Sequence, residues 1–408
     1  MKIAASKFVP FLITGALCAL GLEGILRVWA SASSPVAAVL KVQRESSSQP
    51  FLPDSRLGIR PNPEYPGHDS RGFRNALALE RADIVVLGDS QTYGSGVERE
   101  QAWPERLAQL SSLRVYNMAY PSYGPAHHLM LLEEALALSP QLVIATLYAG
   151  NDLFDCFQLA YCGESAPELR NSEASVVDRV LDLESTNPLV SDIESAEGDD
   201  GSLRAFLSKN SRLVGVLRSM RDTWRGTAWD RSLAGAKLNP DRYACFERGT
   251  LRTVMTPSYR KIALNLDDAR IHEGLRIAHS SMSAIARRCA ESGTAFAVVL
   301  IPTKEYVFST QFSKVEELGT VYGELIGLEG RMWEQTESFL TQEGIESIYA
   351  LTALSSPLVQ GIATYRESSD GHPNPRGQSC IAEAVQEVIA HAYPGMTQIG
   401  RASCRERV

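Results

Sequence analysis

Short apolar runs alternate with longer amphipathic segments along most of this chain. The apolar runs have the length of strands and predict β-structure. They are Ile84–Leu87, Arg114–Met118, Leu142–Tyr148, Ala295–Ile301 and Ile345–Tyr349. The amphipathic segments predict helices at Trp103–Leu110, Ala126–Leu138, Asp267–Glu291, Val321–Gln342 and Arg376–Ala392. Strands that alternate with helices are typical of a parallel sheet. The pattern therefore predicts an α/β fold, a three-layer α/β/α sandwich around a mostly parallel five-stranded sheet.

A long stretch between the third and fourth predicted strands breaks this alternation. We expect the main domain to consist of residues 70–152 and 267–398, with residues 153–266 as an inserted cap. The insertion begins with Cys156 and Cys162 and contains an acidic run through Glu194, Glu197 and Asp199. Its composition predicts a partly helical cap with one flexible acidic loop.

The two ends of the chain differ in composition from the rest. Residues 1–30 are predicted to be an N-terminal membrane anchor or signal segment, because Phe8 to Trp29 is long enough to cross about 30 Å of hydrocarbon. A cleaved signal peptide with Ala30-Ser31-Ala32 as its cleavage site is the alternative. Residues 31–69 are expected to form a tether that leads into the domain. Residues 399–408 resemble the translation of a sequencing-adapter oligonucleotide and are left out of the fold prediction.

Charge and cysteine content narrow the classes of partner. A net charge of −8 provides no basic surface for nucleic acid. Cys156 and Cys162 lie close enough to form a disulfide in an oxidising compartment, and reduced thiols are an equal alternative. The chain has no Cys-x-x-Cys or histidine-rich spacing typical of zinc. We therefore expect neither a metal nor a cofactor.

Two short fragments suggest acyl-transfer chemistry. Gly88-Asp89-Ser90-Gln91 follows a predicted buried strand, so Ser90 is expected at the carboxyl edge of the sheet, where open α/β sheets bind ligands. Asp370-Gly371-His372-Pro373-Asn374 provides an acid and an imidazole near the end of the same domain. In such a site a histidine accepts the serine proton, while a carboxylate orients the imidazole and stabilises its charged form.

Four blocks, in order, resemble those of the SGNH hydrolases, also called the GDSL family, in their membrane-anchored bacterial form. The blocks are Gly88-Asp89-Ser90, Asn117 through Tyr123-Gly124, Gly150-Asn151-Asp152 and Asp370-Gly371-His372-Pro373. The resemblance implies a flavodoxin-like SGNH fold with a catalytic triad of Ser90, His372 and Asp370. It also implies an oxyanion hole formed by the N–H groups of Ser90 and Gly124 and the side chain of Asn151. Single blocks are weak signals, whereas four in order are hard to produce by chance.

Two features of the sequence leave alternatives open. The commoner family spacing places two residues between acid and base, whereas only Gly371 separates Asp370 from His372; the shorter spacing also occurs in relatives that acetylate polysaccharides. Asp152 is a second candidate acid, with a structural role as the alternative. Lys304 and Glu305 follow a predicted strand and could line the pocket, but a surface salt bridge is the expected role.

The functional prediction is a serine esterase acting on an acyl ester, with the O-acyl groups of a cell-surface glycan as substrate. An O-acyltransferase that uses the same triad on a polysaccharide hydroxyl is the alternative, and a non-catalytic glycan-binding module is a further one. The predicted anchor places the protein on the inner membrane with its catalytic domain on the periplasmic side.

Overall fold

The computed structural model describes residues 49–163, 165–189 and 227–395. The chain divides into two compact units, residues 1–47 with 197–231 and residues 48–196 with 232–408. Of the first unit only residues 227–231 are described. The predicted anchor at residues 1–30 and the tail at 399–408 lie outside the described residues. No helix in the described part is long and apolar enough to span a membrane.

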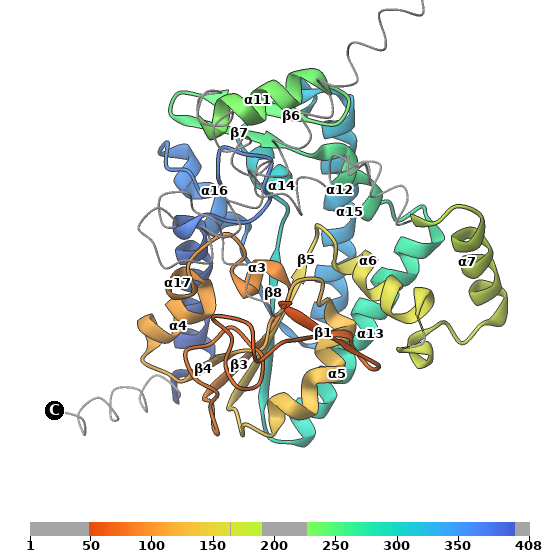
Figure 1. The fold of residues 1–408 in the computed structure, drawn as a ribbon, viewed down its shortest axis with the longest axis vertical. Coiled ribbons are helices and arrows are strands. Elements are labelled where there is room, and N and C mark those ends of the chain that lie inside the picture. Colours follow the sequence, from red (N-terminus) through yellow and green to blue (C-terminus); the bar gives the residue numbers. More distant parts are fainter. Residues whose placement is uncertain (1–48, 164, 190–226, 396–408) are drawn as a thin grey trace, which may run out of the picture. The chain divides into compact units, whose positions relative to one another are not determined.

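A five-stranded parallel sheet forms the centre of the second unit (Figure 1). Its strands lie in the order β4-β3-β5-β8-β9, and every neighbouring pair is parallel. The bounds are β3 (Ile84–Leu87), β4 (Val115–Asn117), β5 (Leu142–Tyr148), β8 (Ala295–Ile301) and β9 (Glu346–Tyr349). All five lie within one residue of the predicted ranges at each end. The predicted α/β fold with a parallel five-stranded sheet is therefore confirmed.

Helices cover both faces of this sheet. In Figure 1, α4 and α17 lie to the left of the sheet, and α5 and α13 lie to its right. The five predicted helices are present as α4 (Trp103–Ser111), α5 (Pro125–Leu136), α13 (Ala269–Glu291), α15 (Thr320–Glu343) and α17 (Pro375–Ala392). Shorter helices are α3 (Ser90–Tyr93), α6 (Asp152–Phe157), α7 (Ala174–Thr186), α11 (Ala228–Leu238), α12 (Pro257–Ala263), α14 (Lys304–Ser309) and α16 (Leu351–Val359).

The strands are buried on both faces, and alternate residues enter different hydrophobic clusters. In β3, Ile84 and Val86 pack on the side of α4 and α17, whereas Val85 and Leu87 pack on the side of α5 and α13. All four are fully buried. A continuous apolar run is what a parallel strand covered on both faces requires. This explains why apolar runs predicted the strands so closely.

Two hairpins lie outside the main sheet. The first pairs β1 (Phe51–Asp54) with β2 (Gly58–Pro61), within the predicted tether, and Leu57 between them is buried in the domain core. The second pairs β6 (Ala244–Arg248) with β7 (Leu251–Met255), within the predicted cap. The sequence pattern at residues 153–266 predicted a partly helical cap with one flexible acidic loop, and no strand.

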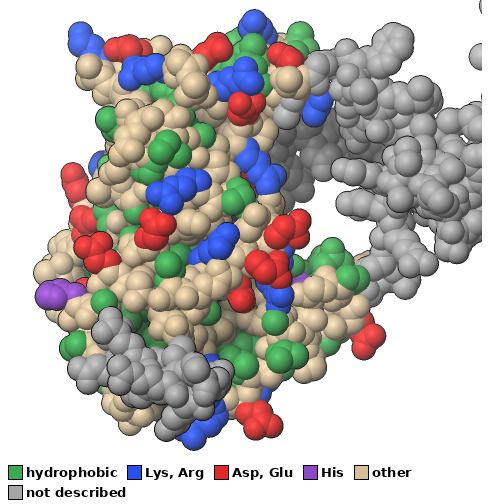
Figure 2. Space-filling model, turned by 90° about the vertical axis from the view of Figure 1, so that its left-hand side faces the viewer, with side chains coloured by type: hydrophobic (Ala, Val, Ile, Leu, Met, Phe, Trp, Pro, Cys, Tyr) green, Lys and Arg blue, Asp and Glu red, His purple; other side chains and the backbone are tan. Residues whose placement is uncertain are grey.

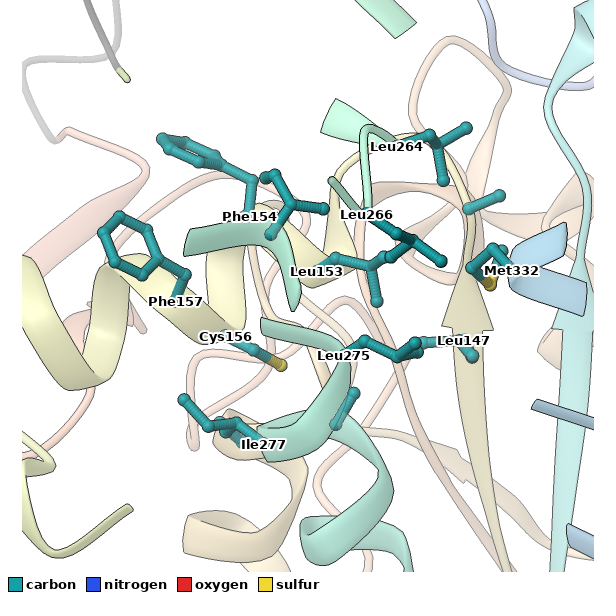
Figure 3. Packing of buried hydrophobic residues seen from close by; sticks show 14 of the residues in the cluster. Leu147, Leu153, Phe154, Cys156, Phe157, Leu264, Leu266, Leu275, Ile277 and Met332 are labelled. Atoms are coloured by element: carbon teal, nitrogen blue, oxygen red, sulfur yellow. The ribbon is translucent and has the colours of Figure 1, made fainter. Parts of the chain in front are cut away.

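Helix α6, at the start of the predicted cap, belongs to the core of the domain. Leu153, Phe154, Cys156 and Phe157 pack with residues of α13 in one hydrophobic cluster (Figure 3). Cys156 and Cys162 are free thiols, so the structure has the reduced alternative and no disulfide between them. The surface is mixed in charge: Figure 2 shows acidic and basic side chains interspersed with hydrophobic ones on the face it presents.

Candidate active site

Ser90 lies at the carboxyl end of β3, where the order of the strands in the sheet reverses. Strands β4 and β5 lie on opposite sides of β3. The connections that follow β3 and β4 therefore run on opposite faces and leave a crevice at this edge. Ser90 begins α3, and Asp89 caps this short helix by accepting a hydrogen bond from the backbone N–H of Gln91 at 2.9 Å.

The turn into Ser90 requires glycine. A Cβ at Gly88 would lie 2.4 Å from Oγ1 of Thr92 and 2.7 Å from Oγ1 of Thr146. Asn117, at the end of β4, donates from its side chain to the carbonyl of Thr92 at 3.1 Å. The first two sequence blocks thus meet in one tight turn, which fixes the position of the serine.

His372 bridges Ser90 and Asp370. Nε2 of His372 lies 2.9 Å from Oγ of Ser90, and Nδ1 lies 2.6 Å from Oδ1 of Asp370. With Nδ1 protonated toward the carboxylate, Nε2 is the acceptor that faces the serine hydroxyl. The structure therefore brings Ser90 together with Asp370 and with His372, which is 282 positions away in the sequence, in the arrangement that nucleophilic catalysis requires.

The short Asp-x-His spacing is accommodated by a turn. Oδ1 of Asp370 accepts the backbone N–H of His372 at 3.0 Å as well as its ring N–H. Beyond the turn, Asn374 caps α17 by accepting from the backbone N–H groups of Arg376 and Gly377. Gln378, one turn into α17, donates to the carbonyl of Gln91 at 3.1 Å. It thus connects the loop that carries Asp370 and His372, the acid–base loop, to the turn that carries Ser90, the serine turn.

Asp370 is held in its charged form. Burial alone would raise its pKa, but the hydrogen bonds from His372 and the nearby charge of Lys304 lower the pKa of Asp370 to about 2. The carboxylate is therefore ionised throughout the range in which proteins function. An ionised partner is what a histidine acting as general base needs.

Lys304 is the largest departure from the sequence prediction. Both Lys304 and Glu305 are buried, so the expected surface salt bridge was wrong. Nζ of Lys304 donates to the carbonyls of Val254, Ser368 and Asp370 at 2.7, 2.9 and 2.9 Å. The ammonium therefore holds the acid–base loop against β7. Burial lowers the pKa of Lys304 to about 8.

Side chains of the β6–β7 hairpin also hold the acid–base loop. Thr253 donates to the carbonyl of Arg366 at 2.7 Å, and Arg252 forms an ion pair with Glu367 at 2.9 Å. Part of the predicted cap thus serves as the backing of the segment that carries Asp370 and His372.

The three predicted oxyanion donors come from the ends of three adjacent strands. Ser90 follows β3, Gly124 immediately precedes α5 in the connection after β4, and Asn151 follows β5. Gly124 lies against the start of α6, because a Cβ there would be 3.0 Å from the carbonyl oxygen of Asp152. Among the hydrogen bonds of the described residues, none uses the backbone N–H of Ser90 or Gly124 as donor. Both groups are consequently available to a ligand.

The side chain of Asn151 is oriented by a buried carboxylate. Its Nδ2 donates to Oδ2 of Asp155 at 2.5 Å, which leaves the second N–H of the amide for another acceptor. Asp152, the second candidate acid, accepts the backbone N–H of Tyr148 at 2.8 Å and is fully buried. It thus caps the end of β5, while Asp370 is the carboxylate that contacts His372.

Buried acids surround the serine turn. Burial raises the pKa of Asp89 to about 6, against the attraction of His372, and it raises the pKa of Asp152 and of Asp155 well above the ordinary value. Apart from the positions of Asp89 and Asp152 in the blocks, no sequence pattern predicted these pKa shifts. Within the described ranges, no group of three or more His, Cys, Asp or Glu side chains could hold a metal ion.

Comparison with known proteins gives matches among solved structures only. No protein-family profile and no curated protein matches the chain. The matching structures include a member of the lipolytic protein G-D-S-L family from Veillonella parvula (10% identity, 75% of this chain and 97% of that one, TM-score 0.34). They also include a GDSL-like lipase from Bacteroides thetaiotaomicron (10%, 77% and 89%, TM-score 0.32). A third is a catalytic mutant of an acetylxylan esterase from Geobacillus stearothermophilus (10%, 76% and 95%, TM-score 0.36).

The family named for the first two is the one that the four sequence blocks resemble. At these identities and TM-scores the matches carry no argument about activity, so the functional case depends on the geometry of Ser90, His372 and Asp370. The structure itself shows an α/β fold around a five-stranded parallel sheet, with the first three sequence blocks after β3, β4 and β5.

Proposed function

We propose that this protein is a serine ester hydrolase of the SGNH type, with Ser90 as nucleophile, His372 as general base and Asp370 as its orienting acid. The observation that carries the proposal is the unbroken chain of hydrogen bonds from Ser90 Oγ through the His372 ring to Asp370, with distances of 2.9 and 2.6 Å. Distances of this kind allow a proton to move as the serine attacks.

The reaction would proceed in two halves. Oγ of Ser90 attacks the ester carbonyl carbon while Nε2 of His372 takes its proton; the tetrahedral intermediate then expels the alcohol, which receives that proton. Water, activated by the same imidazole, attacks the acyl-enzyme and releases the acid and free Ser90. The charge on Asp370 stabilises the imidazolium in both halves, and the buried carboxyl of Asp89 adds to this stabilisation when ionised.

The developing negative charge would be met by neutral donors. The backbone N–H groups of Ser90 and Gly124 are free to donate, and Asn151 has one amide N–H beyond the one bound to Asp155. Donors of this kind stabilise an oxyanion more than a ground-state carbonyl, and each contributes about 3 kcal/mol to the lowering of the barrier.

The substrate class we propose is the O-acyl ester of a cell-surface glycan. The support is the apolar segment Phe8–Trp29 at the start of the sequence, which would hold the catalytic domain at the outer side of the inner membrane, where such glycans lie.

Turnover of p-nitrophenyl acetate by the full chain and its Ser90→Ala and His372→Ala variants tests the proposal. We expect a loss of at least 10³-fold in kcat for each variant and no further loss when the two are combined, because the two residues act as a unit. A burst of nitrophenol followed by acceleration on addition of a sugar acceptor would indicate transfer instead of hydrolysis. Equal activity of the parent and Ser90→Ala proteins would refute the assignment.

A further inference from the structure

Arg260, in α12 of the predicted cap, reaches the acid–base loop. Its Nη1 donates to the carbonyl of Gly150 at 3.0 Å, and a Cβ at Gly371 would lie 2.8 Å from its Nη2. Gly150 precedes the predicted oxyanion donor Asn151, and Gly371 separates Asp370 from His372. The guanidinium therefore lies between the two loops that carry the chemistry.

The charge of Arg260 has no carboxylate partner in the described part of the chain. No Asp or Glu oxygen there lies within 4.0 Å of it, and its Nε is buried without a hydrogen-bond partner. The guanidinium packs against the rings of Tyr148 and Tyr259, with Cζ 5.4 and 4.7 Å from the ring centroids. Such packing stabilises the cation and leaves most of its five N–H donors for another acceptor.

The nearest acidic groups do not use these donors. Glu329 accepts from the backbone and side chain of Thr303 and from Trp333. Glu305 accepts from Thr256 through Oε1, and its Oε2 has no hydrogen-bond partner. Arginine is buried at such positions chiefly when it binds a carboxylate or phosphate. Because Arg260 is partly exposed, that anion can come from outside.

The position of Arg260 indicates which part of the substrate would carry the anion. His372 must donate its proton to the leaving oxygen, so the alcohol part of the ester lies beside His372. Nη2 of Arg260 lies beside Gly371, the residue that precedes His372. We propose that Arg260 binds a carboxylate on the alcohol part of the ester, so that the protein prefers acyl groups on an acidic glycan, one containing uronic acid residues. The inference rests on the proposed ester hydrolysis and adds its substrate preference.

A pair of aryl esters that differ only in charge tests the preference. In 4-acetoxybenzoate the leaving group carries a carboxylate, and in methyl 4-acetoxybenzoate it does not. We expect the kcat/KM of the full chain, divided by the alkaline hydrolysis rate of each ester, to favour the carboxylate by about 10-fold or more, since one charge-assisted contact is lost with the methyl ester. Arg260→Gln should remove this ratio, and Arg260→Lys should keep part of it.

Lys261→Gln is the matched control, because Lys261 is the next residue of α12, has the same charge and pairs with Glu324 at the surface. This variant should keep the wild-type ratio. Acetate release from acetylated oligogalacturonide and from its methyl-esterified form should show the same pattern.

The results of these assays distinguish failure of the anion site at Arg260 from failure of the proposed ester hydrolysis. Turnover of both esters with an equal ratio in wild type and Arg260→Gln would overturn the anion site and leave Arg260 as a packing residue, with ester hydrolysis intact. If neither ester were turned over, binding of 4-hydroxybenzoate to the Ser90→Ala protein, measured by titration beside Ser90→Ala with Arg260→Gln, would still decide: equal affinity refutes the site, and weaker binding without Arg260 supports it.

Discussion

Replacing Lys304 by methionine should separate folding from catalysis in this protein. The side chain is fully buried, and its Nζ donates to three carbonyls, of which two belong to Ser368 and Asp370 in the acid–base loop. Methionine has nearly the same length and an apolar side chain, but it has no donor and no charge. The substitution therefore removes the clamp with little change in packing.

The effect on stability is a difference between two opposing terms. A buried acceptor without a donor costs about 1–3 kcal/mol. The carbonyl of Ser368 keeps a hydrogen bond from Thr253, so the carbonyls of Val254 and Asp370 together would cost roughly 2–6 kcal/mol if neither rearranged. Against this, burial lowers the pKa of Lys304 from 10.5 to about 8, which means that the buried charge itself opposes folding by about 3 kcal/mol at pH 7. We expect a net loss of at most about 3 kcal/mol in the free energy of unfolding, because the two terms oppose each other and the loop can turn a carbonyl to water.

The effect on catalysis should be larger than the effect on the fold. Without the ammonium, the carbonyl of Asp370 loses its link to β7, while Thr253 still holds Arg366 and Ser368, and the carboxylate of Asp370 loses a positive neighbour. A displacement of about 1 Å in a catalytic group can cost 10²-fold in rate. We therefore expect kcat for p-nitrophenyl acetate to fall about 100-fold at a temperature at which the variant is fully folded, with little change in KM.

Urea unfolding and ester turnover of the Lys304→Met protein measure the two terms. The matched control is Lys261→Met, which removes a partly exposed lysine from a surface ion pair and should change neither. The low-field NMR signal of the proton between His372 and Asp370 gives a readout that simple destabilisation would not change; it should broaden or shift in Lys304→Met alone. A folded Lys304→Met protein with kcat within about threefold of wild type would refute the positioning role.

Two further substitutions address the serine turn and the oxyanion donors. Burial raises the pKa of Asp89 to about 6, so stability falls as pH rises from about 4 to 6, because the native state there binds more protons than the unfolded state. Asp89→Asn, which keeps a capping side chain, should therefore match wild type in urea at pH 4, exceed it by at most about 3 kcal/mol at pH 7.5, and be less active; equal stability at both pH values would contradict this. Asn151→Ala should lower kcat for p-nitrophenyl acetate about 100-fold or more with KM little changed, and Asp155→Ala should cost less, because Asp155 only orients the amide; a loss confined to KM in Asn151→Ala would argue against an oxyanion role.

The sheet, and the location of Ser90 and Asn151 at one edge of it, could be predicted from the sequence for a physical reason. A parallel strand buried on both faces must be a continuous apolar run, and the residues that follow it must lie at one edge. Ser90 follows β3 and Asn151 follows β5, so their common location follows from the pattern alone. Hairpin β6–β7 lacks such a run, because the exposed Glu247 and Arg248 end β6 and the partly buried Arg252 lies within β7.

Prediction from residue type alone put Lys304 at the surface and assigned no role to Arg260. A lysine after a strand is far more often exposed than buried, and the partners of Lys304 are backbone carbonyls at Val254, Ser368 and Asp370, which no side-chain pattern encodes. Arg260 is similar, since it donates to the carbonyl of Gly150 and its Nη2 lies where a side chain at position 371 would be. Contacts to backbone atoms from distant segments can be found only once the chain is folded.

The short Asp-x-His spacing links these observations. With one intervening residue, Asp370 can satisfy both the backbone and the ring N–H of His372 through a single oxygen, but only if the turn at Gly371 is held in place. A Cβ at Gly371 would lie 2.8 Å from Nη2 of Arg260, so a side chain there would displace the guanidinium, and the carbonyl of Asp370 is held by Lys304. A compact acid–base turn that is held by the buried Lys304 and the partly exposed Arg260 can therefore replace a longer loop. On this reasoning Gly371→Ala should displace the Arg260 guanidinium and lower kcat while leaving the fold intact, which ties the spacing of the motif to the two cations that the sequence pattern did not identify.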